Sequence, residues 1–456
     1  MNQAYLLPPS LQDWLPEGHL ARFVGEVVEA LELSAIYAKY EAGEGRGLAA
    51  YDPRMMVGVL IYGYCRGVAS SRRIERATYE DVAFRYLAAD QHPDHDRIAA
   101  FRQEQLTSLA QLFVQVLQLC QRAGLVKLGH VALDGTKHKA NASKHKAMSY
   151  ERMEKGEKEL AAEVQALLAE AARVEAEEDG KYGKGKRGDE LPKELGRRES
   201  RLEKIREAKA ALEQEAKEAA EKKQAEVAAQ LKEREKQERQ RGRKLGGRPP
   251  QAPDPEATNP EPKAQRNFTD PESRIRKDGA TKEFVQAYNA QAAVDSHAQV
   301  IVGAAVTQEA NDKKQLVPML KEVKVQMGIP PLQATADNGY FSEANVTDAQ
   351  LQGIDLFVAP DRQKHGEKRP TTTGPPPPDA SVAEQMRHKL GTAEGQAVYK
   401  LRKAVVEPVF GQIKEGRGFR RFLLRGLGKV QGEWQMICAT HNLLKLFRSG
   451  WNPQSA

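Results

Sequence analysis

The chain has 456 residues, of which 40% are hydrophobic and 29% charged, and its formal net charge is +7. This length favours one to three domains, and the mean hydropathy of −0.65 predicts a long polar segment beside a hydrophobic core. A transmembrane helix is excluded because the longest apolar run, Met55–Cys65, has only 11 residues. We expect no secretion signal, and three distant cysteines exclude a disulfide scaffold or a cysteine zinc site.

Residues 1–126 are predicted to form an all-helical domain. Helical periodicity runs through PEGHLARFVGEVVEALEL, and Asp52 followed by Pro53 predicts the N-cap and first position of another helix. Two short helices, SSRRIERA and TYEDVAFRYLA, are expected before one long helix that begins near Asp94 or Asp96.

Short helices packed on a long one are typical of helix-turn-helix-like DNA-binding modules. Four basic side chains around SSRRIERA would then contact DNA, namely Arg66, Arg72, Arg73 and Arg76. A structural bundle with a solvated basic face explains the same pattern equally well, so both interpretations remain open.

Residues 150–240 are predicted to be a charged helical insertion. From Glu151 to Gln240 there are 22 Lys and Arg residues and 24 Asp and Glu residues. The abundance of Ala, Leu, Glu and Lys predicts a long solvated helix or an antiparallel helical hairpin, broken at DGKYGKGKRGDELP. The following residues, 241–265, are rich in Pro and Gly and are predicted to be an extended linker.

Strand patterns dominate after the first domain. Strands are expected in LVKLGHVALDGTK, in a hairpin over AYNAQAAVDSHAQVIVGAAV, and in LQATAD and IDLFVAP, with helices in KKQLVPMLKEVKVQM and SEANVTDAQLQ. The pattern predicts an α/β fold over residues 127–149 and 266–447, with a mixed sheet and flanking helices. This element order matches a ribonuclease-H-like domain, although many folds share parts of it.

Three acids stand at the ends of buried segments. Asp134 ends VALD, Asp337 ends QATAD, and Glu407 lies in the helix-like segment KAVVEPVFGQIK. Carboxylates at strand ends gather at the edge of a sheet where α/β proteins bind ligands. Three converging carboxylates suit hard divalent cations, which prefer oxygen ligands, and two such ions favour an in-line displacement at phosphorus. Taken alone, an Asp at a strand end before Gly is more often a turn residue than a metal ligand, and Glu407 alone would be interpreted as a salt-bridge partner of Lys403 or Lys414.

The positive charge is concentrated in Tyr399–Lys429, which has nine Lys and Arg residues against two Glu residues. Aromatic residues are interleaved with these cations. This composition favours contact with phosphates over an ordinary solvated helix, which usually mixes the two signs of charge.

Several motifs together resemble the DDE transposases of bacterial insertion sequences. They are VALDGTKHKANASKHK, NFTDPESR, AYNAQAAVD, TADNGYFSEAN and RKAVVEPVFGQIKEGRGFRRFLLRG. The chain is most similar to insertion-sequence family 1182, within the group with an InsH-like N-terminal helical domain. The resemblance implies a ribonuclease-H-like catalytic domain in which Asp134, Asp337 and Glu407 are catalytic and hold two Mg²⁺ or Mn²⁺ ions.

The resemblance also implies DNA contacts along the last helices. The family signature Y-(2)-R-(3)-E-(6)-K fits Glu407 and Lys414, whereas Tyr399 and Arg402 lie one residue too far upstream and Lys403 takes the expected arginine position. The DNA-binding residues it implies are Tyr399, Arg402, Lys403, Lys414, Arg417, Arg420 and Arg421, together with Arg72, Arg73 and Arg76. Glu415 is a second candidate for the third acid.

The implied activity is a DNA transposase that binds element ends, cleaves a strand and joins the 3′ hydroxyl to target DNA. The implied partners are double-stranded DNA, as terminal inverted repeats and as target, and a second copy in a synaptic homodimer, without a membrane. A bacterial cytoplasmic, nucleoid-associated location follows. The alternatives are a catalytically inactive DNA-binding relic and a ribonuclease-H-like nuclease or resolvase.

Other polar residues have structural interpretations. His138 and His145 are expected to be solvated residues of a basic loop that could touch DNA. Asp295 and Asp270 are expected in turns, and Asp312 is expected to cap a helix.

Overall fold

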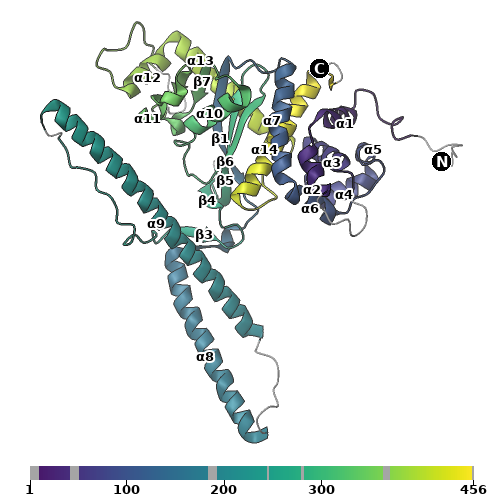
Figure 1. The fold of residues 1–456 in the computed structure, drawn as a ribbon, viewed down its shortest axis with the longest axis vertical. Coiled ribbons are helices and arrows are strands. Elements are labelled where there is room, and N and C mark those ends of the chain that lie inside the picture. The colour runs from purple at the N-terminus through teal and green to yellow at the C-terminus, as the bar shows by residue number, and fades with distance from the viewer. Residues whose placement is uncertain are drawn as a thin grey trace. The chain divides into compact units, whose positions relative to one another are not determined.

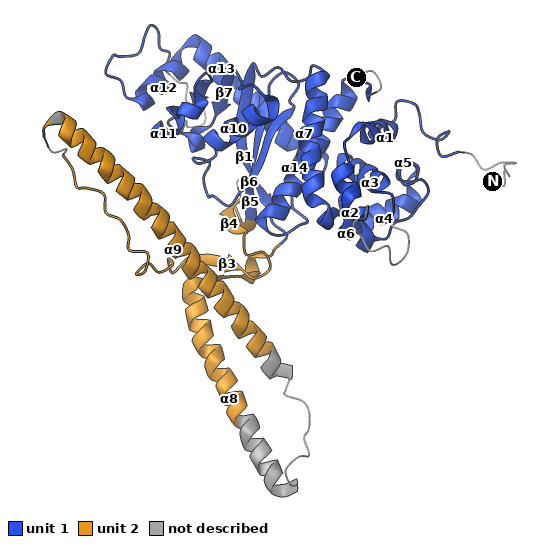
Figure 2. Ribbon diagram, viewed as in Figure 1, with its two compact units in different colours: residues 1–141, 287–456 blue, residues 142–286 orange. Residues whose placement is uncertain are grey.

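The computed structural model describes residues 10–41, 51–182, 193–243, 246–278, 282–362 and 370–453. The chain divides into two compact units, residues 1–141 with 287–456 and residues 142–286, which Figure 2 shows in blue and orange. Over the described ranges, no helix is long and apolar enough to cross a membrane.

Unit 1 begins with seven helices (Figure 1): α1 (Leu20–Ala30), α2 (Ser34–Glu41), α3 (Pro53–Cys65), α4 (Ser71–Glu80), α5 (Val82–Leu87), α6 (His95–Glu104) and α7 (Leu106–Arg122). Asp52 accepts hydrogen bonds from the backbone N–H groups of Arg54 and Met55, which confirms the predicted N-cap of α3. The predicted long helix is wrong in one respect, because the chain breaks at Gln105 into α6, capped by Asp94, and α7.

The mixed α/β class is confirmed by a six-stranded sheet in the order β4-β5-β1-β7-β8, with β6 also paired to β5. The strands are β1 (His130–Lys139), β4 (Arg274–Lys277), β5 (Phe284–Asp295), β6 (Ile301–Thr307), β7 (Gln333–Ala336) and β8 (Asp355–Val358). β5 is antiparallel to β1 and β6, which confirms the predicted hairpin, whereas β7 is parallel to β1 and β8. β4 and residues 284–286 belong to unit 2.

Helices follow the strands in the second half of unit 1: α10 (Leu316–Met327), α11 (Glu343–Val346), α12 (Val382–Gly391), α13 (Ala393–Gly411) and α14 (Leu427–Arg448). α10 packs on β6, and α13 packs on β1, β7 and β8. α14 is buried along most of its length because it contacts α3 and α7 on one side and β6 on the other (Figure 1). The helical first third and the sheet therefore share one hydrophobic core.

Unit 2 is built on two helices, α8 (Tyr150–Tyr182) and α9 (Lys193–Arg241), and on the short pair β2 (Ala147–Ser149) and β3 (Gln265–Asn267). Glu157 forms ion pairs with Arg206 and Lys209, and Glu163 pairs with Arg198, a pattern that makes the helices antiparallel. An apolar cluster between them includes Met153 and Ile205. The predicted helical hairpin is confirmed, and most of its predicted break (183–192) lies outside the described residues.

His138 is fully buried on β1, although the sequence favoured a solvated loop residue. Its ring lies 4.2 Å from the ring of Phe422 and 5.8 Å from that of Trp434, measured between centroids. Neither ring nitrogen has a hydrogen-bond partner within the described part of the chain. Burial, followed by the charge of Lys414, lowers the pKa of His138 to about 3.

This histidine predicts an acid-labile fold. Because its pKa is lower in the folded than in the unfolded chain, the unfolded chain takes up the proton first, and stability falls as pH decreases below about 6.5. His138→Phe should therefore raise the free energy of unfolding at pH 4 relative to pH 8 by on the order of 3 kcal/mol. Urea unfolding at both pH values measures this difference. The exposed His297→Gln is the control, and a wild-type pH dependence in His138→Phe would contradict the prediction.

Candidate active site

Asp134 and Asp337 lie on neighbouring parallel strands. Asp337 directly follows β7, as predicted, but Asp134 does not end its strand, because β1 continues to Lys139 in its pairing with β5. The β1–β7 register pairs Ala132 with Thr335, so continuing it by two residues brings Asp134 opposite Asp337. Adjacent strands lie about 4.8 Å apart, which places the two carboxylates at the same edge of the sheet. The sequence prediction that these two acids meet is therefore supported by the register.

Each acid is oriented by a backbone hydrogen bond close to it in sequence. The N–H of Gly135 donates to Oδ1 of Asp134 at 2.8 Å, and the N–H of Gly339 donates to Oδ1 of Asp337 at 2.8 Å. Such local hydrogen bonds from the backbone fix the orientation of a carboxylate without a partner from elsewhere in the chain.

Arg402 of α13 neutralises Asp134. Its Nη1 lies 3.1 Å from Oδ2 of Asp134, and the two side chains are only 10% and 19% exposed. Burial raises the pKa of Asp134 to about 6, Arg402 opposes that rise, and the carboxylates of Asp337 and Asp312 add to it. The pKa of Asp337 is raised too, mainly by burial. The carboxylates thus form a cluster that requires positive charge.

Asp312 is a third carboxylate at this site, which the sequence interpretation missed. It lies in the loop between β6 and α10, and the predicted helix cap is wrong because Gln315 occupies the N-cap position of α10. Its Oδ1 instead accepts hydrogen bonds from Nδ2 of Asn289 and Nε2 of Gln291, both on β5. The pairing of β5 with β1 brings these two amides to the site. No pattern in the sequence near Asp312 therefore predicts that this residue lies there.

Glu407 is exposed on α13, next to the buried stripe of Arg402, Val405, Val406 and Val409. Within the described ranges, no group of three or more His, Cys, Asp or Glu side chains is arranged to hold a metal ion. The oxygen donors of Asp134 and Asp337 nevertheless have the chemistry that Mg²⁺ prefers. The guanidinium of Arg402 supplies positive charge next to the carboxylate of Asp134.

A hollow with basic walls lies beside Arg402. Its volume is about 470 Å³, and its walls include Tyr399, Lys400, Arg402 and Lys403. Lys403 is exposed, whereas Arg402 is turned inward to Asp134. The structure therefore brings three of the predicted DNA-binding residues of α13 to one cavity.

The remaining predicted cations differ in accessibility. Nζ of Lys414 donates to Oγ1 of Thr136 at 2.5 Å and to the carbonyl of Lys137 at 2.8 Å. Arg417 donates to Thr440 and Ile437 of α14, and burial lowers its pKa to about 10. The exposed cations are Arg420, which pairs with Glu415, Arg421, and on α4 Arg72, Arg73 and Arg76.

Two expected turn residues have the predicted structural roles. Asp295 accepts hydrogen bonds from the backbone N–H groups of Leu128 and His297, and the carbonyl of Asp270 accepts from Ser273. His145 is exposed in a short 3₁₀ turn, as expected.

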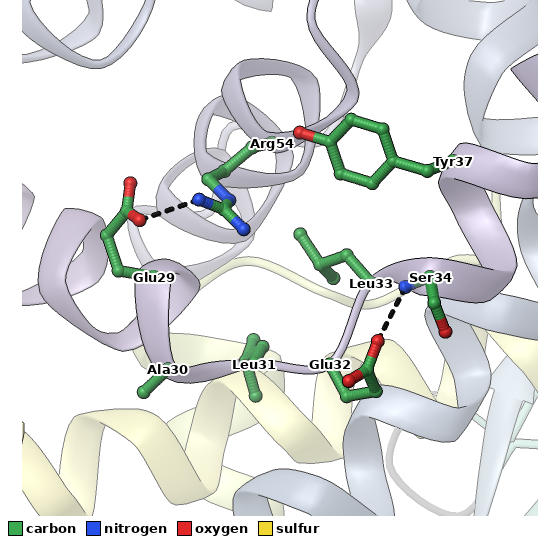
Figure 3. Close-up of a pocket in the computed structure, with 8 residues that line it drawn as sticks. All are labelled: Glu29, Ala30, Leu31, Glu32, Leu33, Ser34, Tyr37 and Arg54. Atoms are coloured by element: carbon green, nitrogen blue, oxygen red, sulfur yellow. Dashed lines mark hydrogen bonds and ion pairs between the residues drawn. The ribbon is translucent and has the colours of Figure 1, made fainter.

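A second hollow, of about 430 Å³, lies among α1, α2 and α3 (Figure 3). Figure 3 shows Arg54 pointing toward Glu29, with which it forms a 2.7 Å ion pair, and Glu32 accepting a hydrogen bond from the backbone of Ser34. Arg54 is thus paired with Glu29, and Glu32 with the backbone of Ser34. None of the three predicted acids lines this cavity.

Two stretches of the chain, one before the first strand and one after the last, match known families. Residues 9–104 match a family described as "Transposase domain (DUF772)", and residues 362–447 match one described as "Transposase DDE domain". The two matches indicate a DNA transposase and are consistent with the DDE transposases of insertion sequences, which confirms the resemblance. No curated protein and no solved structure matches the chain.

The Arg402–Asp134 pair predicts a pH-dependent loss of stability in metal-free protein. Arg402→Gln should lower the free energy of unfolding by about 3 kcal/mol at pH 8, where it leaves a buried carboxylate unpaired. At pH 5 the carboxyl is largely protonated, because its folded pKa is about 6, and the loss should shrink. Urea unfolding with a chelator present measures both values. Arg387→Gln, which breaks an exposed pair with Asp361, is the control, and an equal loss at both pH values would contradict the assignment.

Proposed function

We propose that this chain is a metal-dependent transposase of the DDE type, which cleaves DNA at the ends of its element and joins the freed 3′ hydroxyl to target DNA. One observation carries the proposal: the register of the parallel strands β1 and β7 brings Asp134, within β1, next to Asp337, which directly follows β7. The family matches, one before the first strand in the sequence and one after the last, indicate that the substrate is DNA.

The strand order supports a ribonuclease-H-like catalytic domain. β1, β5 and β6 form an antiparallel meander, and β7 and β8 add in parallel on the other side of β1. The first acid is on the central strand β1, and the second follows its parallel neighbour β7.

Asp134, Asp337 and Glu407 would hold the divalent ions. Bound Mg²⁺ or Mn²⁺ stabilises the attacking and leaving oxygens of an in-line displacement at phosphorus. For its part, the chain orients Asp134 and Asp337 through Gly135 and Gly339. Glu407, on the exposed side of α13, would complete the set when DNA and metal are bound.

Lys403 and the surface cations Arg420 and Arg421 would contact phosphates near the acids, and Arg72, Arg73 and Arg76 of α4 would contact the element end. All six side chains are exposed. Cations placed in this way neutralise the DNA backbone without reading its bases. Joining two ends calls for two active sites, so we propose a homodimer in the synaptic complex, acting at the bacterial nucleoid.

The proposed activity is tested with a plasmid that carries the gene and its natural flanking DNA. Purified protein with Mg²⁺ should nick the plasmid at inverted repeats and, with a pre-cut end, join that end to target DNA. Asp134→Asn, Asp337→Asn and Glu407→Gln should each lower the cleavage rate by about 10³-fold or more, because each removes a proposed metal ligand. Sequencing of nicked and joined products measures both steps.

Glu415→Gln is the matched control for Glu407, since Glu415 is an exposed acid paired with Arg420 in the same segment. Loss of cleavage in Glu415→Gln but not in Glu407→Gln would move the third acid to Glu415. Absence of nicks in the wild type would favour an inactive DNA-binding relic, and nicks without joining would favour a nuclease or resolvase.

The phosphate contacts are tested by the salt dependence of DNA binding. Lys403→Ala and Lys414→Ala should weaken binding to every DNA sequence and make the slope of log K against log salt shallower by about 0.9 for each lost contact. Lys324→Ala, on the exposed side of α10, should leave the slope unchanged. An unaltered slope in both Lys403→Ala and Lys414→Ala would show that neither side chain contacts a phosphate.

A further inference from the structure

Asp312 is not one of the three acids of the proposed site, yet it is held beside two of them, Asp134 and Asp337. Its Oδ1 accepts hydrogen bonds from Nδ2 of Asn289 at 2.7 Å and from Nε2 of Gln291 at 2.6 Å. Both amides come from β5, which pairs with β1 opposite Asp134. Two neutral amides orient the carboxylate without cancelling its negative charge. That charge can therefore still attract a cation nearby.

The same carboxylate is closely approached by the backbone after each catalytic acid. A Cβ on Gly135 would lie 2.7 Å from Oδ1 of Asp312, and a Cβ on Gly339 would lie 3.3 Å from its Oδ2. The Gly339 position is also only 3.0 Å from Oδ1 of Asp337. A side chain at Gly135 would clash with Asp312 and one at Gly339 would be tight against it, so the backbone at both positions packs closely on Asp312.

We infer that Asp312 is a positioning residue: it fixes the backbone beside Asp134 and the backbone beside Asp337 relative to each other and adds a negative charge that draws a divalent cation to these two acids. The inference rests on the proposed function, since it concerns the same metal site. The electrostatics agree, because the charge of Asp312 is among those that raise the pKa of Asp134 and of Asp337, behind burial in both cases. Groups that support metal ligands in this way commonly change metal affinity by about 10-fold to 100-fold when removed.

The test is the affinity of the full chain for Mn²⁺, measured by the electron paramagnetic resonance of free Mn²⁺, together with the thermal unfolding midpoint. Asp312→Asn keeps the shape of the side chain and an acceptor for both amides but removes the charge. We expect its Kd for Mn²⁺ to rise about 10-fold or more, with an unfolding midpoint close to that of the wild type. A purely structural role would lower the midpoint and leave the affinity unchanged.

Glu309→Gln is the matched control, because Glu309 is an acid of the same loop that pairs with Lys314 at the surface. Its Kd should equal that of the wild type, and wild-type affinity in Asp312→Asn overturns the inference. If Asp312→Asn does not fold, Asn289→Ala replaces it, since this change keeps the charge but removes one of the two amide donors. Its Kd should rise several-fold, and an unchanged Kd likewise overturns the inference.

Asp134→Asn separates this inference from the proposed function. Binding lost in Asp134→Asn but retained in Asp312→Asn overturns only the role of Asp312. Wild-type binding in Asp134→Asn, or absence of binding in the wild type, overturns the proposed metal site together with the inference.

Discussion

The constraint on which the half of unit 1 that carries the sheet depends is the close placement of three carboxylates, Asp134, Asp312 and Asp337, in a partly buried part of the sheet. Carboxylates withdrawn from water need positive charge or hydrogen-bond donors close by. Here Arg402 supplies the charge, and Asn289 and Gln291 supply donors. These groups come from separate stretches of the chain, so the site exists only when the sheet and α13 are assembled together.

α14 provides much of that assembly from the other side of the sheet. The indole N–H of Trp434 donates to the carbonyl of Gln291, the residue whose side chain holds Asp312. The amide of Asn442 bonds both backbone groups of Ile301 on β6, and the carboxylate of Glu433 accepts from the N–H groups of Leu423 and Leu424. Because α14 also packs on α3 and α7, the helical first third shares its core with the strands that carry the acids. A polar side chain in the core of α14 is thereby connected to the geometry of the active site.

The sequence predicted what depends on local pattern. The strand end at Asp337, the hairpin of β5 and β6, and the cap at Asp52 follow from alternation and turn chemistry over a few residues. The strand end expected at Asp134 is wrong, because pairing with β5 extends β1 to Lys139. Asp312 and His138 were misread because their surroundings are created by long-range packing: β5 amides reach the first, and Phe422 and Trp434 bury the second. Likewise, the periodicity across α6 and α7 is continuous, so the break at Gln105 could not be seen in the pattern. The burial of a side chain and the identity of its hydrogen-bond partners depend on the whole fold. Residue spacing predicts them only where the residues in contact are close in sequence.

Arg402 lies one residue upstream of the arginine position in the family signature, and this offset changes which side of α13 the arginine occupies. Successive residues of a helix are about 100° apart, so Arg402 and Lys403 face different surroundings on α13. Arg402 falls in the buried stripe with Val405, Val406 and Val409, and it meets Asp134, whereas Lys403 stays exposed at the adjoining hollow. Glu407 is five residues from Arg402, about 140° round the helix, but one turn from Lys403. The offset thus gives the two neighbours different surroundings: the inward arginine balances the acids, and the outward lysine, on the side of Glu407, is the one placed for the phosphate contact that we propose.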